Sequence, residues 1–254
     1  MDIYMVHLKV NSYSLYLCSL VLLFSFCKSY ALTLTIGTLS YNPPYEIQLT
    51  NTQKQEFYGF EINLMDEICK RIKAKCQYKA VLFQDIFSKL NSGEIDLGIA
   101  TISVTPERGQ NFLFSMPYIP SSSQFLVLAN SNFTNPEDLK GKTIGVFRGS
   151  SDVDLAKEYF KNNIQLTYYD TAENMLNALD NQEISALIAD SGQVSYWADN
   201  SMSTYKLLGN SIPNPLGYAI MAKLGQDALI KQINQALIDM ENDGTYLKIY
   251  NLTF

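Results

Sequence analysis

Residues 59–72, GFEINLMDEICKRI, set the expected fold class together with the two apolar segments that flank them. Apolar side chains fall at positions 62, 64, 65, 68 and 72, a spacing that predicts an amphipathic helix. TLTIGT at 33–38 precedes this helix and CQYKAV at 76–81 follows it, and each has the pattern of a short strand. A strand, a helix and a second strand in this order indicate a βαβ unit, and therefore a mostly parallel sheet covered by helices.

The alternation of strands and helices continues along the chain, which predicts an α/β protein with two lobes. Further strands are expected at 97–100, 124–128, 143–146, 165–168, 186–189 and 218–221. Further helices are expected at 85–90, 106–110, 136–139, 152–161, 172–179, 229–240 and 245–249. The segment GNSIPNPLG at 209–217 has the composition of a loop, and we expect the chain to cross between lobes there and near 119–124. Lobe 1 then comprises residues 32–119 and 217–254, and lobe 2 comprises residues 120–216.

Residues 1–31 have the pattern of a secretory signal peptide. Lys9 precedes the apolar run LYLCSLVLLFSF at 15–26, and Ser29-Tyr30-Ala31 offers small residues at the positions before a cleavage site. The run is shorter than the roughly 20 apolar residues of a membrane span. We expect cleavage after Ala31 and a periplasmic protein, with a lipid anchor on Cys27 as the alternative.

Composition excludes several classes of function. The 254 residues carry a formal net charge of -6, whereas binding to nucleic acid needs a cationic surface. The one histidine, His7, lies in the predicted leader, which excludes Ser/His and Cys/His catalytic triads and histidine-ligated metal sites from the mature chain. We therefore expect no nucleic-acid partner, no metal and no cofactor.

Two cysteines, Cys69 and Cys76, remain after the predicted cleavage. Cys69 lies late in the predicted helix at 59–72 and Cys76 opens the next strand, and their spacing excludes a CxxC redox motif. In an oxidising compartment the pair can form a disulfide; two free buried thiols are the alternative.

A series of short motifs resembles the extracytoplasmic polar-amino-acid-binding proteins of ABC importers. The motifs are IGT at 36–38, PPY at 43–45, GFEINL at 59–64, EIDL at 94–97, ISVTPER at 102–108, FSMPY at 114–118, LKGKTIGV at 139–146, RGSS at 148–151, AD at 189–190 and DGTY at 243–246. The resemblance implies a type II periplasmic binding fold, with two Rossmann-like lobes joined by a two-strand hinge. It also implies a monomer that closes on a free L-amino acid and delivers it to a membrane permease.

The resemblance assigns one part of the site to the ligand carboxylate. Arg108 follows Thr105 at a helix start, so its guanidinium can fold back toward the amides near Ser103. The family uses this arginine as a carboxylate clamp, assisted by Ser103 and Thr101. In the second lobe, Ser150 and Ser151 precede a helix, and the resemblance assigns their amides to the carboxylate from the opposite side.

The resemblance assigns the rest of the site to the ligand ammonium and side chain. Asp190, at the end of an apolar strand, is expected to bind the ammonium, and Phe60 and Phe147 are expected to form aromatic walls. The Cys69–Cys76 pair resembles the disulfide of the lysine/arginine/ornithine, histidine and arginine binders, which favours arginine or another basic ligand. The chain departs from these binders at Leu39, where they carry an acidic residue, at Asn42, where they carry an aromatic ring, and at Ala100, where they carry a hydroxyl. A neutral ligand such as glutamine therefore stays open.

Two other functions remain as alternatives. An exported enzyme of the cyclohexadienyl dehydratase kind uses the same fold, but it needs a positioned general acid or base, and Asp190 is the one candidate that the sequence directs to the cleft. A ligand-binding sensor for a membrane receptor is the second alternative. We expect a binding protein without catalytic activity.

Overall fold

The computed structural model describes residues 32–49 and 56–254, so the predicted leader at 1–31 and Cys27 lie outside the described residues. The strands are β1 (Leu32–Thr38), β2 (Tyr41–Asn42), β3 (Glu46–Leu49), β4 (Glu56–Tyr58), β5 (Ala74–Ala80), β6 (Leu97–Gly98), β7 (Phe112–Phe114), β8 (Ile119–Leu128), β9 (Thr143–Phe147), β10 (Gln165–Tyr169), β11 (Ala186–Asp190), β12 (Tyr205–Tyr218) and β13 (Met221–Lys223). The helices are α2 (Phe60–Arg71), α3 (Phe83–Ser92), α4 (Pro106–Gly109), the 3-10 helix η1 (Pro136–Leu139), α5 (Asp152–Tyr159), α6 (Ala172–Asp180), α7 (Ser191–Asn200), α8 (Asp227–Asn242) and α9 (Thr245–Asn251).

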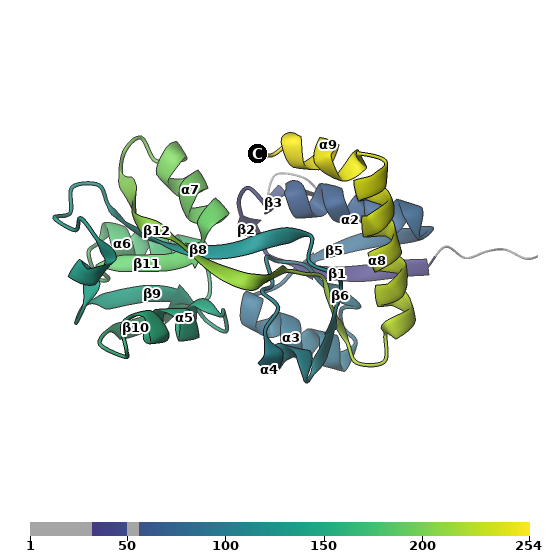
Figure 1. Cartoon of the computed structure of the whole chain (residues 1–254), viewed down its shortest axis with the longest axis horizontal. Coiled ribbons are helices and arrows are strands. Elements are labelled where there is room, and N and C mark those ends of the chain that lie inside the picture. Colours follow the sequence, from purple (N-terminus) through teal and green to yellow (C-terminus); the bar gives the residue numbers. More distant parts are fainter. Residues whose placement is uncertain (1–31, 50–55) are drawn as a thin grey trace, which may run out of the picture. The chain divides into compact units, whose positions relative to one another are not determined.

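The first five-stranded sheet has the order β5-β1-β6-β13-β7. β1 and β6 are parallel, with Ile36 opposite Leu97, whereas β13 runs antiparallel to both β6 and β7. Helices α2, α8 and α9 cover one face of this sheet and α3 covers the other (Figure 1). The predicted βαβ unit of β1, α2 and β5 is present, with β5 and β1 as neighbours in the sheet.

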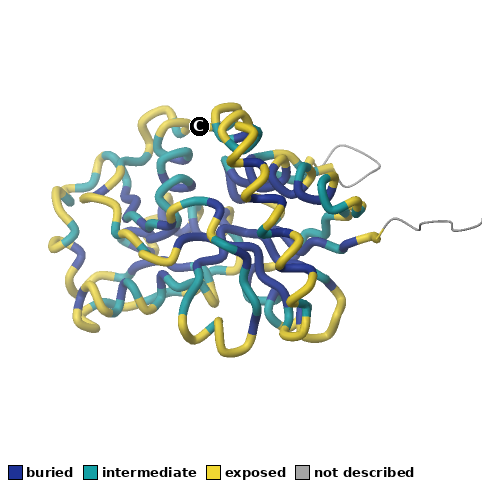
Figure 2. Tube along the Cα trace, turned by 45° about the vertical axis from the view of Figure 1, so that its right-hand side comes forward, coloured by how far each residue is buried: buried dark blue, intermediate teal, exposed yellow. Residues whose placement is uncertain are grey.

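The second five-stranded sheet has the order β10-β9-β11-β8-β12. β9 is parallel to both β10 and β11, and β8 runs antiparallel to both β11 and β12. Helix α5 packs on one face of this sheet, and helices α6 and α7 pack on the other. In Figure 2 the buried residues follow the strands and the inner faces of these helices. The fold class predicted from the sequence, α/β with two lobes, is confirmed.

The prediction of a loop at 209–217 is wrong, because the whole segment belongs to the 14-residue strand β12. Ile212, Pro213 and Asn214 lie opposite Ser123, Ser122 and Ser121 of β8, with irregular register on either side of them. Glycine and proline gave the segment its loop-like composition. However, β12 is an edge strand, and an edge strand tolerates proline because one side of its backbone needs no ladder partner. The pair β8 and β12 continues toward the first sheet, where Tyr218 forms a bridge with Ser103.

Several further elements were not predicted. Strands β2, β3 and β4 form a small antiparallel sheet, the short strand β7 lies at the edge of the first sheet, and helix α7 directly follows β11. These strands are only two to four residues long, too short to show the alternation that identifies a strand in a sequence. The small sheet carries Asn42 and Glu46, and the Asn42 amide donates a hydrogen bond to the Glu46 carboxyl group.

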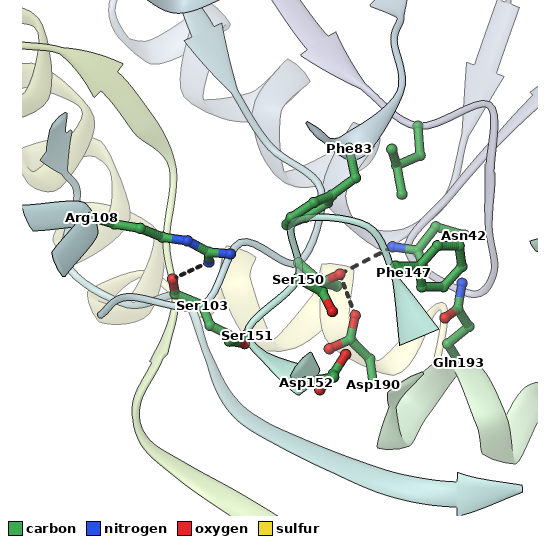
Figure 3. Close-up of a pocket in the computed structure, with 12 residues that line it drawn as sticks. Asn42, Phe83, Ser103, Arg108, Phe147, Ser150, Ser151, Asp152, Asp190 and Gln193 are labelled. Atoms are coloured by element: carbon green, nitrogen blue, oxygen red, sulfur yellow. Dashed lines mark hydrogen bonds between the residues drawn. The ribbon is translucent and has the colours of Figure 1, made fainter. Parts of the chain in front are cut away.

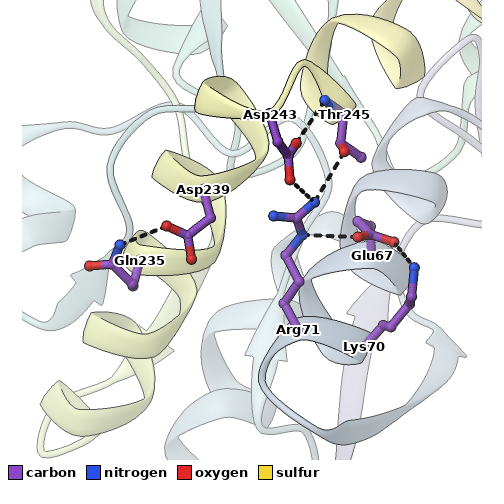
Figure 4. A network of polar contacts seen from close by, with 7 residues as sticks. All are labelled: Glu67, Lys70, Arg71, Gln235, Asp239, Asp243 and Thr245. Atoms are coloured by element: carbon purple, nitrogen blue, oxygen red, sulfur yellow. Dashed lines mark hydrogen bonds and ion pairs between the residues drawn. The ribbon is translucent and has the colours of Figure 1, made fainter.

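Helix α2 begins at Phe60 because Gly59 turns the chain sharply at that point. Gly59 has a φ of 130°, and a Cβ atom there would lie 2.2 Å from the carbonyl oxygen of Tyr45. The far end of α2 is tied to the junction between α8 and α9 (Figure 4). There the Arg71 guanidinium contacts Glu67 at 2.9 Å and Asp243 at 2.8 Å. Exposed pairs of this kind contribute about 0–1 kcal/mol each, so they orient the helices more than they stabilise them.

The predicted disulfide joins Cys69 of α2 to Cys76 of β5, with a Cα–Cα distance of 6.0 Å. It links the end of the helix to the edge strand of the first sheet across a short turn. Among the described residues, no helix has both the length and the apolar character that a bilayer span requires.

Replacing both cysteines with serine is expected to lower the free energy of unfolding by about 2–3 kcal/mol, because the bridge restricts the unfolded chain. Urea denaturation of the double variant, next to the oxidised and the reduced wild-type protein, measures this effect. The reduced wild type should match the double variant. If the double variant and the reduced wild type both kept the urea midpoint of the oxidised wild type, a stabilising role for the disulfide would be contradicted.

Candidate functional site

A pocket lies between the first and second sheets, at the ends of strands from both (Figure 3). It holds about 360 Å³ of empty space, including the part open to solvent. Its walls consist of one arginine, two aspartates, two amides, four hydroxyl residues and three apolar side chains. They are Arg108, Asp152, Asp190, Asn42, Gln193, Thr101, Ser103, Ser150, Ser151, Leu39, Phe83 and Phe147.

Arg108 is positioned by the short helix α4. The Thr105 hydroxyl caps this helix by accepting the backbone N–H of Arg108 at 3.2 Å. The guanidinium then folds back: Nη1 donates to the carbonyl of Ser103 at 2.7 Å, and Nη2 donates to the carbonyl of Gly149 at 2.9 Å. Its remaining N–H groups can bind a carboxylate in the pocket.

Two phenylalanine rings support the Arg108 guanidinium. Its central carbon lies 5.6 Å from the centre of the Phe83 ring and 5.2 Å from that of Phe87. Burial lowers the pKa of Arg108, while the negative charge of Asp152 raises it. An arginine keeps its charge in such surroundings, so the pocket contains a fixed positive group.

The loop after β9 carries Ser150 and Ser151 into the pocket, opposite Arg108. Gly149 precedes them with a φ of 80°, a left-handed conformation that glycine adopts without strain. The buried Ser150 hydroxyl faces Asp152 but has no partner at hydrogen-bond geometry. The loop therefore presents small polar groups at the start of helix α5.

Asp190 ends β11, and its carboxylate accepts hydrogen bonds from two hydroxyl groups. Thr101 of the first sheet's loop donates to one oxygen and Tyr218 of β12 donates to the other. Burial raises the pKa of Asp190 to about 8, and the charge of Asp152 contributes to this rise. An ionised Asp190 is therefore costly in the pocket unless a cationic group comes close to it.

Asp152, the first residue of α5, is the second carboxylate of the pocket and is buried. Its Oδ1 accepts a hydrogen bond from the Ser123 hydroxyl at 2.5 Å. Burial raises its pKa, whereas the Ser123 hydrogen bond and the Arg108 charge lower it. Asp152 thus has two partners of its own within the protein.

Thr101 has a backbone conformation that is unusual for a β-branched residue, with a φ of 45°. The buried carboxylate of Glu61 accepts the Thr101 N–H at 2.8 Å, and it also accepts the Tyr118 hydroxyl. These contacts hold the strained backbone and direct the Thr101 hydroxyl to Asp190.

The carboxyl groups of Glu61 and Glu46 are neighbours, both side chains are fully buried, and the Oε2 atom of each has no hydrogen-bond partner. Two buried carboxyl groups this close avoid like-charge repulsion only if one of them carries a proton. Glu61 accepts two donors, whereas Glu46 accepts one, the Asn42 amide at 3.1 Å. Burial and the neighbouring Glu61 raise the pKa of Glu46 well above its usual 4.5, so Glu46 is the protonated partner.

Replacing Glu46 with glutamine is expected to preserve folding, because the amide is neutral, as the protonated acid is. The folded wild type keeps on Glu46 a proton that the unfolded chain releases above pH 4.5, so its free energy of unfolding falls as the pH rises. The Glu46→Gln variant should lose less stability between pH 5 and pH 8, as measured by urea denaturation across that range.

The Glu46→Ala variant serves as the comparison. It leaves the buried Asn42 amide without its Glu46 acceptor and is expected to lose about 2–4 kcal/mol. Equal losses for the glutamine and alanine variants would contradict a protonated Glu46 beside Glu61.

Seven of the eight residues predicted for the site line this pocket, and Phe60 does not. Phe60 is fully buried in the core of the first lobe, with its ring near those of Tyr118, Tyr246 and Phe254. Its position at the start of α2 turns it toward α9 instead of the pocket. Phe83, the first residue of α3, provides the aromatic wall on this side.

Two pocket residues, Phe83 and Gln193, were not predicted from the sequence. Both lie shortly after the carboxyl end of a strand, β5 for Phe83 and β11 for Gln193. Strand ends of this kind form the ligand crevice of α/β sheets, so their position was an available signal. Within residues 32–49 and 56–254, no cluster of three or more His, Cys, Asp or Glu side chains is arranged to hold a metal ion.

A protein-family model covers nearly all of the described chain. The model described as "Bacterial extracellular solute-binding proteins, family 3" matches residues 34–254. A solved structure with a TM-score of 0.84 is 39% identical and covers 88% of this chain and 100% of its own. That structure is an arginine 3rd transport system periplasmic binding protein from Legionella pneumophila.

Curated relatives from other bacteria match over most of their length. The arginine-binding periplasmic protein of Mannheimia haemolytica is 30% identical, with 82% of this chain and 86% of the relative covered. The ABC transporter glutamine-binding protein GlnH of Bacillus subtilis is 32% identical, with 80% of this chain and 74% of the relative covered.

Proposed function

Because the chain belongs to the bacterial extracellular solute-binding proteins of family 3, we propose that it captures one free polar L-amino acid and delivers it to the membrane permease of an ABC importer. The single observation that carries this proposal is the presence of Arg108 and Asp190 in one small pocket. A free amino acid has a carboxylate and an ammonium group on the same carbon. Two half-buried groups of opposite charge complement these two ends.

In this proposal, Arg108 binds the ligand carboxylate from the first lobe. The backbone N–H groups of Ser103 and Ser151 and the Ser150 hydroxyl, which has no partner in the protein, complete the carboxylate site. Asp190 and the Thr101 hydroxyl bind the ammonium. An ammonium next to Asp190 supplies the cation that this carboxylate lacks, and so it favours the ionised form.

The aromatic rings Phe83 and Phe147 form walls for the ligand side chain, with Phe83 in the role expected of Phe60. We propose that residues 32–119 and 217–254 form the first lobe, residues 120–216 form the second, and β8 and β12 act as the hinge. Ligand docks on the first lobe, and closure adds Ser150, Ser151 and Asp190. These contacts exist only in the closed state, so ligand shifts the population toward closure.

We further propose that residues 1–31 direct export to the periplasm, where the Cys69–Cys76 disulfide can form, and that the protein acts there as a monomer without catalytic activity. Incubation with prephenate or arogenate should then give no aromatic product.

Differential scanning fluorimetry tests the proposed function. A panel of the twenty amino acids with ornithine, citrulline and cystine should contain at least one compound that raises the melting temperature by mass action. The named relatives include arginine binders and a glutamine binder, so basic and neutral polar ligands are both on the panel. A panel without any shift, repeated by calorimetry without any heat, would contradict the proposed function.

A further inference from the structure

Two amide side chains in the pocket have polar atoms without a partner. Asn42 and Gln193 are each 1% exposed, and both line the pocket. The Oδ1 atom of Asn42 and the Nε2 atom of Gln193 have no hydrogen-bond partner in the protein. Buried polar groups are nearly always hydrogen-bonded in folded proteins, so these two atoms indicate groups that a ligand provides.

The orientation of the Asn42 amide is determined by its neighbours. Its Nδ2 donates to Glu46 at 3.1 Å and to the Thr101 hydroxyl at 3.2 Å. Rotating the amide by half a turn would lose both bonds and place its oxygen against the Glu46 oxygen. Asn42 therefore offers an acceptor to the pocket.

Gln193 belongs to the first turn of α7 in the other lobe and offers a donor. In Figure 3, Asn42, Phe147 and Gln193 lie on the side of Asp190 that is remote from Arg108. With the ligand carboxylate at Arg108 and its ammonium at Asp190, the ligand side chain would extend toward the two amides.

The other walls at this end of the pocket are apolar. Leu39 and Phe147 line the pocket, whereas Phe83 packs against the Arg108 guanidinium; Asp152 accepts a hydrogen bond from Ser123 and is close enough to feel the charge of Arg108. Asp190 is used by the ligand ammonium. Among the residues that line this pocket, a cationic side chain would thus lose its water next to Leu39 without gaining a carboxylate of its own.

We propose that the pocket selects L-amino acids whose side chain ends in a neutral group with both a donor and an acceptor, a carboxamide or a ureido group, over arginine and lysine. This inference rests on the proposed function. The N–H of such a group donates to Asn42 Oδ1, and its carbonyl accepts from Gln193 Nε2. It differs from the preference for a basic ligand that the sequence resemblance implied.

Calorimetry of the wild-type protein with L-glutamine, L-citrulline, L-arginine and L-lysine tests the proposal. Citrulline and arginine have the same shape and differ by one oxygen in place of a charged nitrogen, so they form a matched pair. The tighter of glutamine and citrulline should bind at least tenfold more tightly than arginine or lysine. Any smaller preference, or a preference for a cation, would overturn the proposal.

Two variants test the assigned residues. Gln193→Glu replaces the free donor by a carboxylate, and Leu39→Asp adds one nearby; each should reduce the preference for citrulline over arginine at least tenfold. Gln165→Glu makes the same chemical change at an exposed position of β10 and should leave the preference unchanged. An unchanged preference in both pocket variants would remove Gln193 and Leu39 from side-chain recognition.

The failure of this inference is distinguishable from failure of the proposed function. Binding of arginine or lysine that depends on Arg108, with glutamine and citrulline weaker, would leave the proposed function intact and overturn only the selectivity. Absence of binding by all amino acids would overturn both.

Discussion

Replacing Arg108 with alanine is expected to weaken amino-acid binding about 150- to 5,000-fold, because the ligand carboxylate then has no guanidinium partner. Removing one member of a buried charge pair costs about 3–5 kcal/mol, which corresponds to this range of affinity. The substitution also removes the hydrogen bonds from Arg108 to the carbonyls of Ser103 and Gly149. The Gly149 bond joins elements of the two sheets, so the closed conformation is weakened as well. Calorimetry with the ligand identified by thermal shift measures the loss.

Arg148→Ala is the matched control for this experiment. The Arg148 side chain of the wild type is 47% exposed, pairs with Asp170 at 2.9 Å and does not line the ligand pocket. Affinity should change less than threefold on its removal, in accordance with the small contribution of exposed ion pairs. Both variants should unfold cooperatively. Near-normal affinity in the Arg108→Ala variant would contradict the carboxylate clamp.

Replacing Asp190 with asparagine is expected to weaken binding to a similar extent while the ligand-free protein becomes at least as stable as the wild type. Asparagine has the size of aspartate but no charge, so the ligand ammonium loses its counter-ion. In the ligand-free protein the same substitution is not destabilising, because burial disfavours the charged form of Asp190 and raises its pKa from 3.8 to about 8. The folded state therefore binds a proton that the unfolded chain releases, and the free energy of unfolding falls as the pH rises from about 4 to 8.

The Asp190→Asn variant should show a smaller decrease in stability over this pH range than the wild type. Urea denaturation at pH 5, 6.5 and 8 gives the slope, and calorimetry gives the affinity. Asp239→Asn, on α8 and remote from the pocket, should change neither (Figure 4). A variant that binds normally, or one with the wild-type dependence on pH, would contradict the role assigned to Asp190.

Much of the fold could be predicted because its elements carry local patterns. The apolar stripe of α2 and the buried strand before Asp190 depend on side chains close in sequence, and both are found where the sequence predicts them. The edge strand β12 was missed because its proline and glycine residues are typical of loops. Its pairing with β8 involves residues about 90 positions away, and no local pattern carries that information.

Some residues of the ligand site could also be predicted from the sequence, whereas others could not. Arg108, Ser150, Ser151 and Asp190 lie at helix starts and strand ends, which sequence patterns locate and the family resemblance identifies. Phe60 was assigned to the site because it follows Gly59 in a family motif, yet it is buried in the core. Neighbouring residues at the start of a helix point about 100° apart, so a shift of one position decides whether a side chain faces the pocket or the core.

The order of this chain's residues predicts an α/β protein of two lobes, and the family resemblance that it carries assigns Arg108 and Asp190 to one site. Folding in three dimensions brings Asn42 and Gln193, 151 positions apart, into one pocket and leaves an acceptor and a donor unpaired there. It likewise brings Glu46 and Glu61 together, so that one proton is retained in the core. Helices and strands can be predicted from residues that are close in the sequence, because they depend on local backbone geometry and burial. Whether a polar atom is hydrogen-bonded depends on which residues from distant parts of the chain come next to it.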